Sequence, residues 1–358
     1  KVVKIDGEAS FTGPKTLSVK KSDGSVEEMT ADAIIVATGS VNAQPPIPGL
    51  KENPNCIDST GALSLEKLPK SMVVIGGGVI GLELACAYAA FGTRITVVEA
   101  LDHMLPMLDG DLTKIGVAHM KKMGMAFNLE CPVQAVEASP VGAKVVCKNK
   151  AGETVSFEAE KVLVAIGRKA NTASLNLEAA GLANDRGRII VNDKMETSVP
   201  GVYAIGDVIG PRRIMLAHMA VAEAHTAVHN ILHPEDRKAQ RYDVVPSAIF
   251  TAPEIGDVGL SEAQAKQQGF AVKTSVFQFR ELGKAQAMGE LAGLFKLVVE
   301  EGSGKLLGAH IAGAHASDLI AEATLAIQRG CTARDLFETI HAHPTLSEGI
   351  YEAAGSLV

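Results

Sequence analysis

The chain has 358 residues, of which 47% are hydrophobic and 21% are charged, a composition that excludes a disordered polymer and can fill two or three packed domains. Its formal net charge of −7 argues against a nucleic-acid ligand, since phosphates demand a basic surface. No run of about 18 apolar residues could span a membrane. The cysteines, at positions 56, 86, 131, 147 and 331, lack any metal-type spacing and predict reduced thiols of an intracellular protein.

The first thirty residues alternate polar and apolar side chains and contain turn signals at Gly13-Pro14 and Asp23-Gly24, which predict antiparallel strands joined by hairpins. Continuous apolar runs that end in glycine then predict strands buried on both faces. These runs cover residues 33–40, 72–76, 162–167 and 202–206. Helical patterns between them favour a doubly wound α/β structure up to about residue 230. The proline-rich stretch 44–49 predicts a crossing between lobes.

The clearest motif is a G-x-G-x-x-G turn at residues 76–81, placed between the strand at 72–76 and a helix that ends at Phe91-Gly92. A second strand, 94–98, ends in Glu99. This arrangement is typical of dinucleotide sites, in which the glycines allow a tight turn and a close approach of the pyrophosphate to the helix N-terminus. Glu99 accepts hydrogen bonds from ribose hydroxyls and repels a 2′-phosphate, so it favours NAD over NADP.

The pattern changes after a polar boundary near residues 236–246. Strands are predicted at 272–279, 294–300 and 306–311, followed by a helix over about 317–329 that is closed by Gly330. Strands first and helices afterwards predict a separate α+β domain.

These patterns, together with four short motifs, resemble the pyridine nucleotide-disulfide oxidoreductases, flavoenzymes that pass electrons between NAD(P)H and a disulfide. The motifs are Ala37-Thr38-Gly39-Ser40, Ala165-Ile166-Gly167-Arg168, Ala204-Ile205-Gly206-Asp207 and the segment from His341 to Glu348. The resemblance implies a Rossmann-like NAD domain inserted in an incomplete FAD domain, followed by a C-terminal α+β dimerisation domain. The implied boundaries are 1–40 for the C-terminal part of the FAD domain, 41–170 for the NAD domain, 171–241 for a central FAD-contacting segment and 242–358 for the dimerisation domain.

The resemblance also implies which residues contact each cofactor. For NAD they are Gly76, Gly77, Gly78, Val79, Ile80, Gly81, Leu82, Glu83, Glu99, Val133 and Gly167. For FAD they are Thr38, Gly39, Ser40, Asp207, Met215, Leu216, Ala217 and His218, with Asp207 on the ribityl chain. In the family, the glutamate at the position of Glu83 pairs with a lysine near the redox cysteines.

The resemblance assigns the acid–base chemistry to His343, with Glu348 on the other imidazole nitrogen to fix its tautomer. Histidine suits this work because its pKa lies near neutrality. The implied His343–Pro344 bond is cis, Thr345 is a candidate N-cap of the following helix, and His341 is structural. The alternative is a capped surface helix with an incidental histidine. In the family this histidine serves the partner subunit, so a homodimer is expected.

A metal site is a competing interpretation for His225, His229 and His233, which stand four residues apart on one helical face. The segment lacks the glutamate of H-E-x-x-H, and no carboxylate completes an obvious site. A polar helix face is therefore the expectation, and no metal is predicted.

Two family features are missing from these 358 residues: the FAD-binding G-x-G-x-x-G and the redox pair C-x-x-x-x-C. We therefore expect an N-terminally truncated chain that is inactive alone and holds FAD weakly. The complete protein is expected to oxidise protein-bound dihydrolipoamide with NAD⁺ through FAD and a redox disulfide, with lipoyl domains of 2-oxo acid dehydrogenase complexes as partners. The expected location is the cytoplasm, or the mitochondrial matrix in a eukaryote.

Three alternatives stay open at this point. Mercuric and glutathione-type reductases belong to the same class of enzyme, although Glu99 disfavours the second. A non-catalytic NAD-binding and dimerisation module belongs to a different class.

Overall fold

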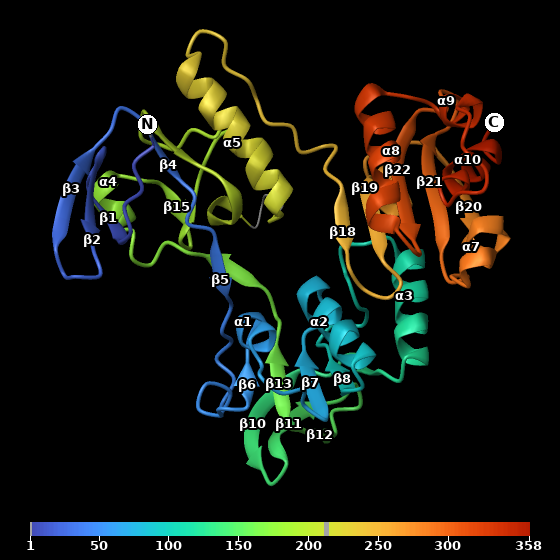
Figure 1. Ribbon diagram of the computed structural model, residues 1–358, viewed down its shortest axis with the longest axis horizontal. Helices are drawn as coiled ribbons and strands as arrows, with labels where there is room; N and C mark the ends of the chain where they lie inside the picture. Colours follow the sequence, from blue (N-terminus) through green and yellow to red (C-terminus); the bar gives the residue numbers. More distant parts are fainter. Residues whose placement is uncertain (1, 211–214) are drawn as a thin grey trace. The chain divides into compact units, whose positions relative to one another are not determined.

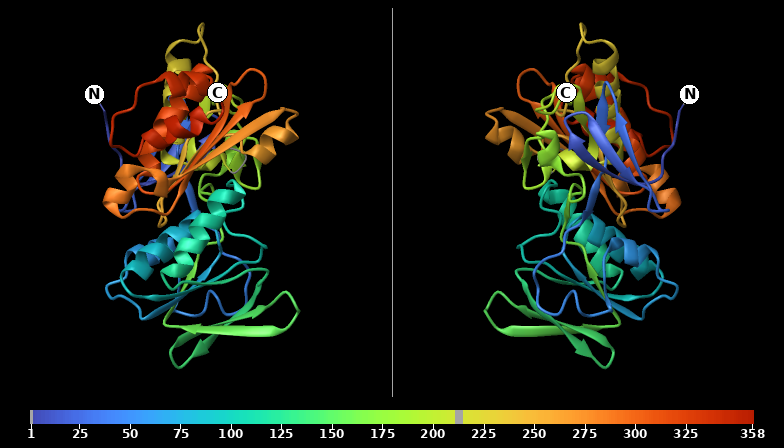
Figure 2. Two further views of the ribbon diagram at one scale, coloured as in Figure 1. Left: turned by 90° about the vertical axis from the view of Figure 1, so that its right-hand side faces the viewer. Right: turned by 90° about the vertical axis from the view of Figure 1, so that its left-hand side faces the viewer.

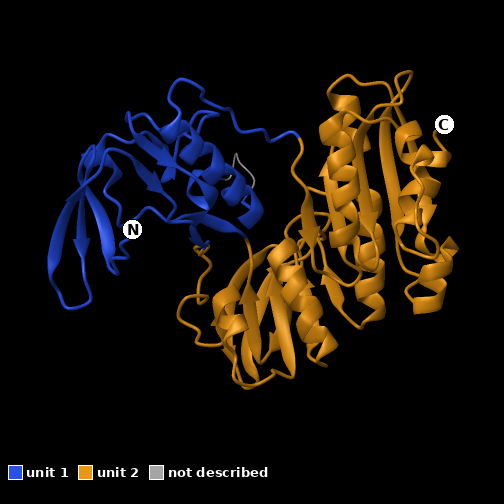
Figure 3. Ribbon diagram, turned by 45° about the horizontal axis from the view of Figure 1, so that its top comes forward, with its two compact units in different colours: residues 1–43, 167–243 blue, residues 44–166, 244–358 orange. Residues whose placement is uncertain are grey.

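The computed structural model describes residues 2–210 and 215–358 and contains two compact units (Figures 1 and 3). Unit 1 comprises Lys1–Ala43 and Gly167–Asp243, and unit 2 comprises Gln44–Ile166 and Val244–Val358. The four functional ranges predicted above stay a prediction, and their residues 1 and 211–214 lie outside the described part. None of the described helices is long and apolar enough to cross a membrane.

Unit 1 is built from short strands, and its first three form the predicted antiparallel sheet in the order β1-β2-β3. Its elements are β1 (Glu8–Gly13), β2 (Thr16–Lys20), β3 (Val26–Thr30), β4 (Ile34–Val36), β5 (Ser40–Asn42), β14 (Arg168–Ala170), α4 (Leu177–Ala180), β15 (Asn184–Asp185), β16 (Arg188–Ile189), β17 (Val202–Ala204), the 3₁₀ helix η1 (Gly206–Ile209) and α5 (Ala217–Leu232). β17 pairs parallel with β4, and β14 pairs antiparallel with β5. The buried side chains of β4 and β17 lie in the core of this unit.

The first part of unit 2, residues 44–166, is called the nucleotide lobe here. Its elements are β6 (Cys56–Ile57), α1 (Ser59–Leu63), β7 (Ser71–Ile75), α2 (Val79–Ala90), β8 (Arg94–Val98), α3 (Gly110–Lys122), β9 (Ala126–Asn128), β10 (Val133–Ser139), β11 (Gly142–Lys148), β12 (Thr154–Ala159) and β13 (Lys161–Val164). A parallel sheet in the order β6-β13-β7-β8-β9 forms its centre.

Both faces of this parallel sheet are buried, as the continuous apolar runs predicted. Helices α2 and α3 cover one face, and the antiparallel sheet β10-β11-β12 covers the other (Figure 2). The connection between β9 and β13 is a three-stranded antiparallel meander, for which the sequence analysis made no specific prediction. Alternating burial along β11 shows why strands form there.

The second part of unit 2, residues 244–358, is called the interface lobe here. Its elements are β18 (Ser247–Ile249), β19 (Ile255–Gly259), α6 (Glu262–Gln267), β20 (Val272–Gln278), the 3₁₀ helix η2 (Phe279–Glu281), α7 (Gly283–Met288), β21 (Leu294–Glu300), β22 (Leu306–Ala312), α8 (Ala316–Arg329), α9 (Ala333–Glu338) and α10 (Glu348–Gly355). The strands form an antiparallel sheet in the order β18-β19-β22-β21-β20. One face packs on α8, α9 and α10.

The other face of this sheet packs against the nucleotide lobe. Ile249, Ile255, Leu294 and Ala312 belong to the same buried cluster as side chains of α2, α3, β7 and β8. The two lobes therefore share a hydrophobic core, which explains why they form one compact unit.

Buried charges lie beside this shared core. His310 on β22 is paired in register with Asp257 on β19 and Lys296 on β21. The His310 side chain is 1% exposed, with Nδ1 2.5 Å from the Asp257 carboxylate and Nε2 3.1 Å from the carbonyl oxygen of Leu260. Burial alone would lower the pKa of His310, but the hydrogen bond and charge of Asp257 outweigh it and raise that pKa.

The raised pKa of His310 predicts a pH dependence of stability. Its contribution is fully present below the unfolded-state pKa of about 6.5 and is lost as pH rises through the folded value. We expect the difference in unfolding free energy between wild type and His310→Gln to be largest near pH 6. It should then fall by up to about 1.4 kcal/mol for each pH unit crossed between the two pKa values. Urea denaturation across this range measures it, and a pH-independent difference would contradict the protonated state.

Candidate functional site

The glycine turn after β7 is shaped by two close backbone approaches. Gly76 has φ +109°, and a Cβ placed on it would lie 2.5 Å from the carbonyl oxygen of Ala165. A Cβ on Gly81 would lie 2.6 Å from the carbonyl oxygen of Gly76. The approach to Ala165 occurs beside β13, where the strand order of the sheet reverses, and ligands of open α/β sheets bind at such switch points.

Gly78 differs from its neighbours because nothing lies within 4 Å of the position a Cβ would take. It is the N-cap of α2 and has no side chain to bond the first N–H groups of that helix. The N-terminus of α2, with its uncapped donors and the positive end of the helix dipole, therefore lies next to open space at Gly78, an arrangement that fits the pyrophosphate of a dinucleotide.

Glu99 follows β8 and lies against the same turn. Its Oε2 accepts a hydrogen bond from the N–H of Gly77 at 2.5 Å, and its Oε1 accepts one from the N–H of Leu101 at 2.8 Å. Each carboxylate oxygen can accept a further bond, so the group fits the hydroxyls of an adenosine ribose. The N–H of Cys131 bonds the Glu99 carbonyl oxygen at 2.8 Å, which places the start of β10, where Val133 stands, beside this segment.

The first turns of α2 hold the remaining predicted NAD residues. Val79 and Ile80 are partly exposed, whereas Leu82 is fully buried in the shared core. Glu83 points to the interface lobe, where its Oε1 accepts a hydrogen bond from the N–H of Phe250 at 2.8 Å. Burial raises the pKa of the Glu83 carboxyl.

In unit 1 the predicted flavin residues gather at the ends of β4 and β17. These strands run parallel and in register, so the Thr38-Gly39 and Gly206-Asp207 corners meet at one edge. The Ser40 hydroxyl donates to Asp207 Oδ2 at 2.5 Å. Gly39 has φ +68° and open space around its Cβ position. A carboxylate beside an open glycine corner fits the hydroxylated ribityl chain of a flavin.

The sequence reasoning missed two residues that hold this edge in place. Arg168 donates from Nε to the Ser40 hydroxyl at 2.6 Å and from Nη1 to the side chain of Asn42 at 2.7 Å. The buried Glu223 accepts a hydrogen bond from the N–H of Gly206 at 2.6 Å. The Gly-Arg pair of a predicted motif was a usable signal for Arg168, whereas Glu223 lies in a helix with no motif.

Other predicted contact residues lie in the same unit. Leu216 is the N-cap of α5, Met215 precedes it, and Ala217 and His218 are its exposed first residues. Gly167 has φ +124°, and its carbonyl oxygen accepts the N–H of Ala43 at 3.0 Å. The structure thus brings the flavin residues together in unit 1 and the NAD residues, Gly167 excepted, together in unit 2.

The predicted acid–base pair lies at the start of α10, with His343 before the helix and Glu348 as its first residue. His343 Nδ1 lies 2.8 Å from Glu348 Oε1, and the two side chains are 77% and 20% exposed. The other carboxylate oxygen of Glu348 accepts the N–H of Thr345 at 2.9 Å. This bond and the one to His343 lower the pKa of Glu348, so the carboxylate is ionised and accepts from the imidazole at neutral pH.

In this segment the position of the helix N-cap differs from the prediction, whereas the cis peptide bond agrees with it. The candidate N-cap is wrong, because α10 begins at Glu348 with Ser347 as its N-cap, and Thr345 Oγ1 bonds the carbonyl oxygen of Ala342 instead. The cis bond between His343 and Pro344 is confirmed.

The neighbouring histidines have other surroundings. The His341 side chain is 6% exposed, with Nε2 2.9 Å from Glu322 and Nδ1 2.8 Å from the carbonyl oxygen of Thr339. His229 contacts the carbonyl oxygen of Asp236 at 2.7 Å and the ring of His233, and His225 is exposed. Over residues 2–210 and 215–358, no group of three or more histidine, cysteine, aspartate or glutamate side chains could hold a metal ion.

Comparisons with known proteins agree with this geometry. Residues 1–224 match the family model described as pyridine nucleotide-disulphide oxidoreductase, and residues 245–354 match the dimerisation domain of the same family. The chain is 41% identical to a dihydrolipoyl dehydrogenase of Geobacillus stearothermophilus over 99% of this chain and 74% of that one. It is 42% identical to the one of Halobacterium salinarum over 98% and 73%.

A solved structure supports the same fold. The Cu(II) complex of the HOCl-induced flavoprotein disulfide reductase RclA from Escherichia coli aligns with a TM-score of 0.91 at 27% identity, over 98% of this chain and 78% of that one. The predicted resemblance and the predicted fold class are confirmed.

The open space at Gly78 predicts a separation of binding from folding. Gly78→Ala should fold with an unchanged melting temperature, because φ is −81° and the Cβ meets nothing. It should weaken NAD⁺ binding by about tenfold or more, since a methyl group occupies the approach of the pyrophosphate. Isothermal calorimetry and thermal melts measure both. Gly110→Ala, also without neighbours within 4 Å, is the matched control, and unaltered NAD⁺ affinity in Gly78→Ala would contradict the site.

Proposed function

The chain belongs to the pyridine nucleotide-disulphide oxidoreductase family, and from that premise we propose that it serves the NAD⁺-linked oxidation of protein-bound dihydrolipoyl groups to the disulfide. The family uses FAD and NAD, and several relatives named dihydrolipoyl dehydrogenase match nearly the whole chain at about 40% identity. The observation that carries the proposal is the exposed His343 held by the carboxylate of Glu348.

His343 is proposed to move the proton of the substrate thiol. Glu348 is ionised and accepts the hydrogen of Nδ1, which leaves Nε2 as the basic nitrogen of the imidazole. Nε2 would take the proton as the thiolate forms and release it to water later. The carboxylate also stabilises the positive charge that the ring carries in between. When bound, FAD would supply the two-electron acceptor that links the substrate thiols, through a redox disulfide, to NAD⁺.

The cofactor roles of the other residues are part of the same proposal. The N-terminus of α2 and Gly78 would receive the pyrophosphate of NAD, and Glu99 would bind the adenosine ribose. Asp207, held by the Ser40 hydroxyl, would bind the ribityl hydroxyls of FAD. The remaining predicted contact residues keep the roles that the family resemblance gives them.

The dimerisation domain at residues 245–354 supports a homodimer. We propose that His343 acts on the thiols of the partner subunit's site and that lipoyl domains of 2-oxo acid dehydrogenase complexes supply the substrate. We also propose a cytoplasmic location, or the mitochondrial matrix in a eukaryote. The five free cysteines fit such a reducing compartment.

Replacing His343 tests this function directly. His343→Gln should lower the NAD⁺-linked rate of dihydrolipoamide oxidation by roughly 10²- to 10⁴-fold, because it removes the proposed acceptor of the thiol proton. NAD⁺ affinity and melting temperature should not change, since the side chain is 77% exposed. The rate is measured from the absorbance of NADH, with the full-length protein that the gene encodes.

His341→Gln is the positional control. That residue is buried between Glu322 and Thr339, so its loss should lower the melting temperature and change the rate less than tenfold. A nearly normal rate in His343→Gln would refute the acid–base assignment.

A further inference from the structure

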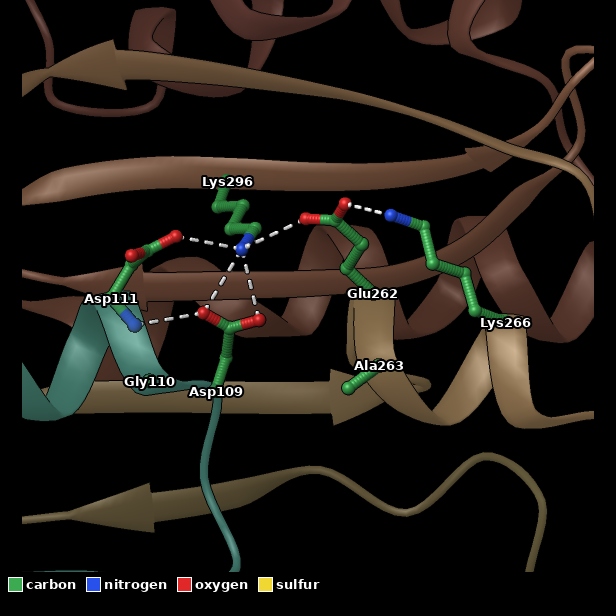
Figure 4. A pocket seen from close by; sticks show the side chains of 7 residues that line it. All are labelled: Asp109, Gly110, Asp111, Glu262, Ala263, Lys266 and Lys296. Carbon is green, nitrogen blue, oxygen red and sulfur yellow. Dashed lines mark hydrogen bonds and ion pairs between the residues drawn. The ribbon is translucent and has the colours of Figure 1, made fainter. Parts of the chain in front are cut away.

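A buried lysine joins the two lobes of unit 2. Lys296 lies on β21 of the interface lobe, and its side chain is 5% exposed. Its Nζ lies 3.0 Å from both carboxylate oxygens of Asp109 and 2.8 Å from Asp111 Oδ2, at the start of α3 in the nucleotide lobe (Figure 4). Because an unpaired ammonium group would be costly at such a site, the lysine fixes where α3 begins.

Oppositely charged side chains surround the ammonium group of Lys296. Glu262 on α6 lies 3.5 Å from the Lys296 ammonium and bonds Lys266 with its other oxygen at 2.6 Å (Figure 4). Lys296 lowers the pKa of Asp111. Burial alone would lower the pKa of Lys296, and the bonds to Asp111 and Asp109 outweigh it and raise that pKa. The ammonium is therefore engaged by residues of the chain, and the cluster is a junction rather than a ligand site.

Asp109 ends the loop that begins after Glu99. It is the N-cap of α3, where its side chain accepts the N–H of Asp111 at 3.0 Å. Within the loop, Leu105 is 1% exposed, and its N–H donates to the carbonyl oxygen of Gly77 at 3.0 Å. The loop of residues 100–109 is thus held at its far end by Lys296 and seated in its middle on the glycine turn.

We propose that Lys296 is a positioning residue through which the interface lobe fixes loop 100–109 on the glycine turn and so sets the affinity for NAD. The inference rests on the NAD site proposed above. The same loop starts at Glu99, whose carboxylate bonds the N–H of Gly77, so a displacement of the loop moves both the ribose acceptor and the turn under the pyrophosphate.

The apolar contact between the lobes does not replace this junction. Hydrophobic burial is non-directional and leaves the rotation and axial position of α3 less defined than a two-oxygen contact to one ammonium group does. The lysine therefore supplies the direction that the shared core lacks.

The test compares Lys296→Met with wild type by hydrogen exchange and by NAD⁺ binding. Loss of the ammonium should speed exchange of the Leu105 amide by about tenfold or more. It should also raise the Kd for NAD⁺ by about fivefold or more. Asp109→Asn keeps an N-cap residue and weakens the same junction, so it should change both measurements less and in the same direction. It also serves as the test if Lys296→Met does not fold.

Two controls separate positioning from a general loss of stability. Leu336→Ala truncates the core on the opposite face of the interface sheet and should lower the melting temperature with no change at Leu105 or in NAD⁺ affinity. Lys266→Met removes an exposed lysine beside the same charged cluster. It should change neither the exchange of the Leu105 amide nor the affinity for NAD⁺.

The outcomes separate this inference from the proposed function. Unchanged Leu105 exchange and NAD⁺ affinity in both junction variants would overturn the role of Lys296 while leaving the NAD site standing. Equal changes of Leu105 exchange and NAD⁺ affinity in Leu336→Ala and Lys296→Met would show that Lys296 acts only through overall stability. That result would also overturn the positioning role. Failure of the wild-type protein to bind NAD⁺ would refute the NAD site, and with it the claim on affinity.

Discussion

The close approach of backbone segments at the switch point of the parallel sheet constrains the whole nucleotide lobe. A side chain at Gly76 would meet the carbonyl oxygen of Ala165, and one at Gly81 would meet that of Gly76. Strand β7 and helix α2 can therefore pack only at glycine distance, and this packing directs the N-terminus of α2. Open space at Gly78 lies at this N-terminus, so the proposed pyrophosphate site would arise from missing side chains rather than from charged ones.

Directional contacts between the lobes come from polar groups such as the buried Lys296 and the carboxylate of Glu83, because the shared apolar core supplies free energy without fixing an angle. Lys296 and His310 are neighbours across β21 and β22, and each needs its own carboxylate. His310 takes Asp257 from the same sheet, whereas Lys296 takes Asp109 from α3. A buried cation without a partner is costly. These two ion pairs therefore stabilise the contact of β22 with β19 and the contact of β21 with the start of α3.

The sequence predicted most of what depends on local pattern. The bounds of β8 and β21 agree with the prediction to the residue, and α8 begins one residue earlier than expected. The meander β10–β12 was not predicted, although β11 alternates in burial. Lys296 was missed for another reason: its partner Asp109 lies 187 residues away, so in the sequence it looks like any surface cation. Arg168 lies in a predicted motif, but its partner Ser40, 128 residues away, could not be predicted from that motif. The glycine turn could be predicted because its parts are contiguous.

His341 and His343 show that surroundings, and not residue type, decide which histidine can exchange a proton. Both nitrogens of His341 face oxygen atoms of the chain on a buried side chain, so its ring is held in a structural role. His343 gives one nitrogen to Glu348 and keeps the other on a largely exposed ring. Glu348 holds it from the first residue of α10, where the helix N-terminus favours a negative charge. The two histidines are only two positions apart, but the imidazole of His341 is structural and that of His343 is free to serve as the proposed acid and base.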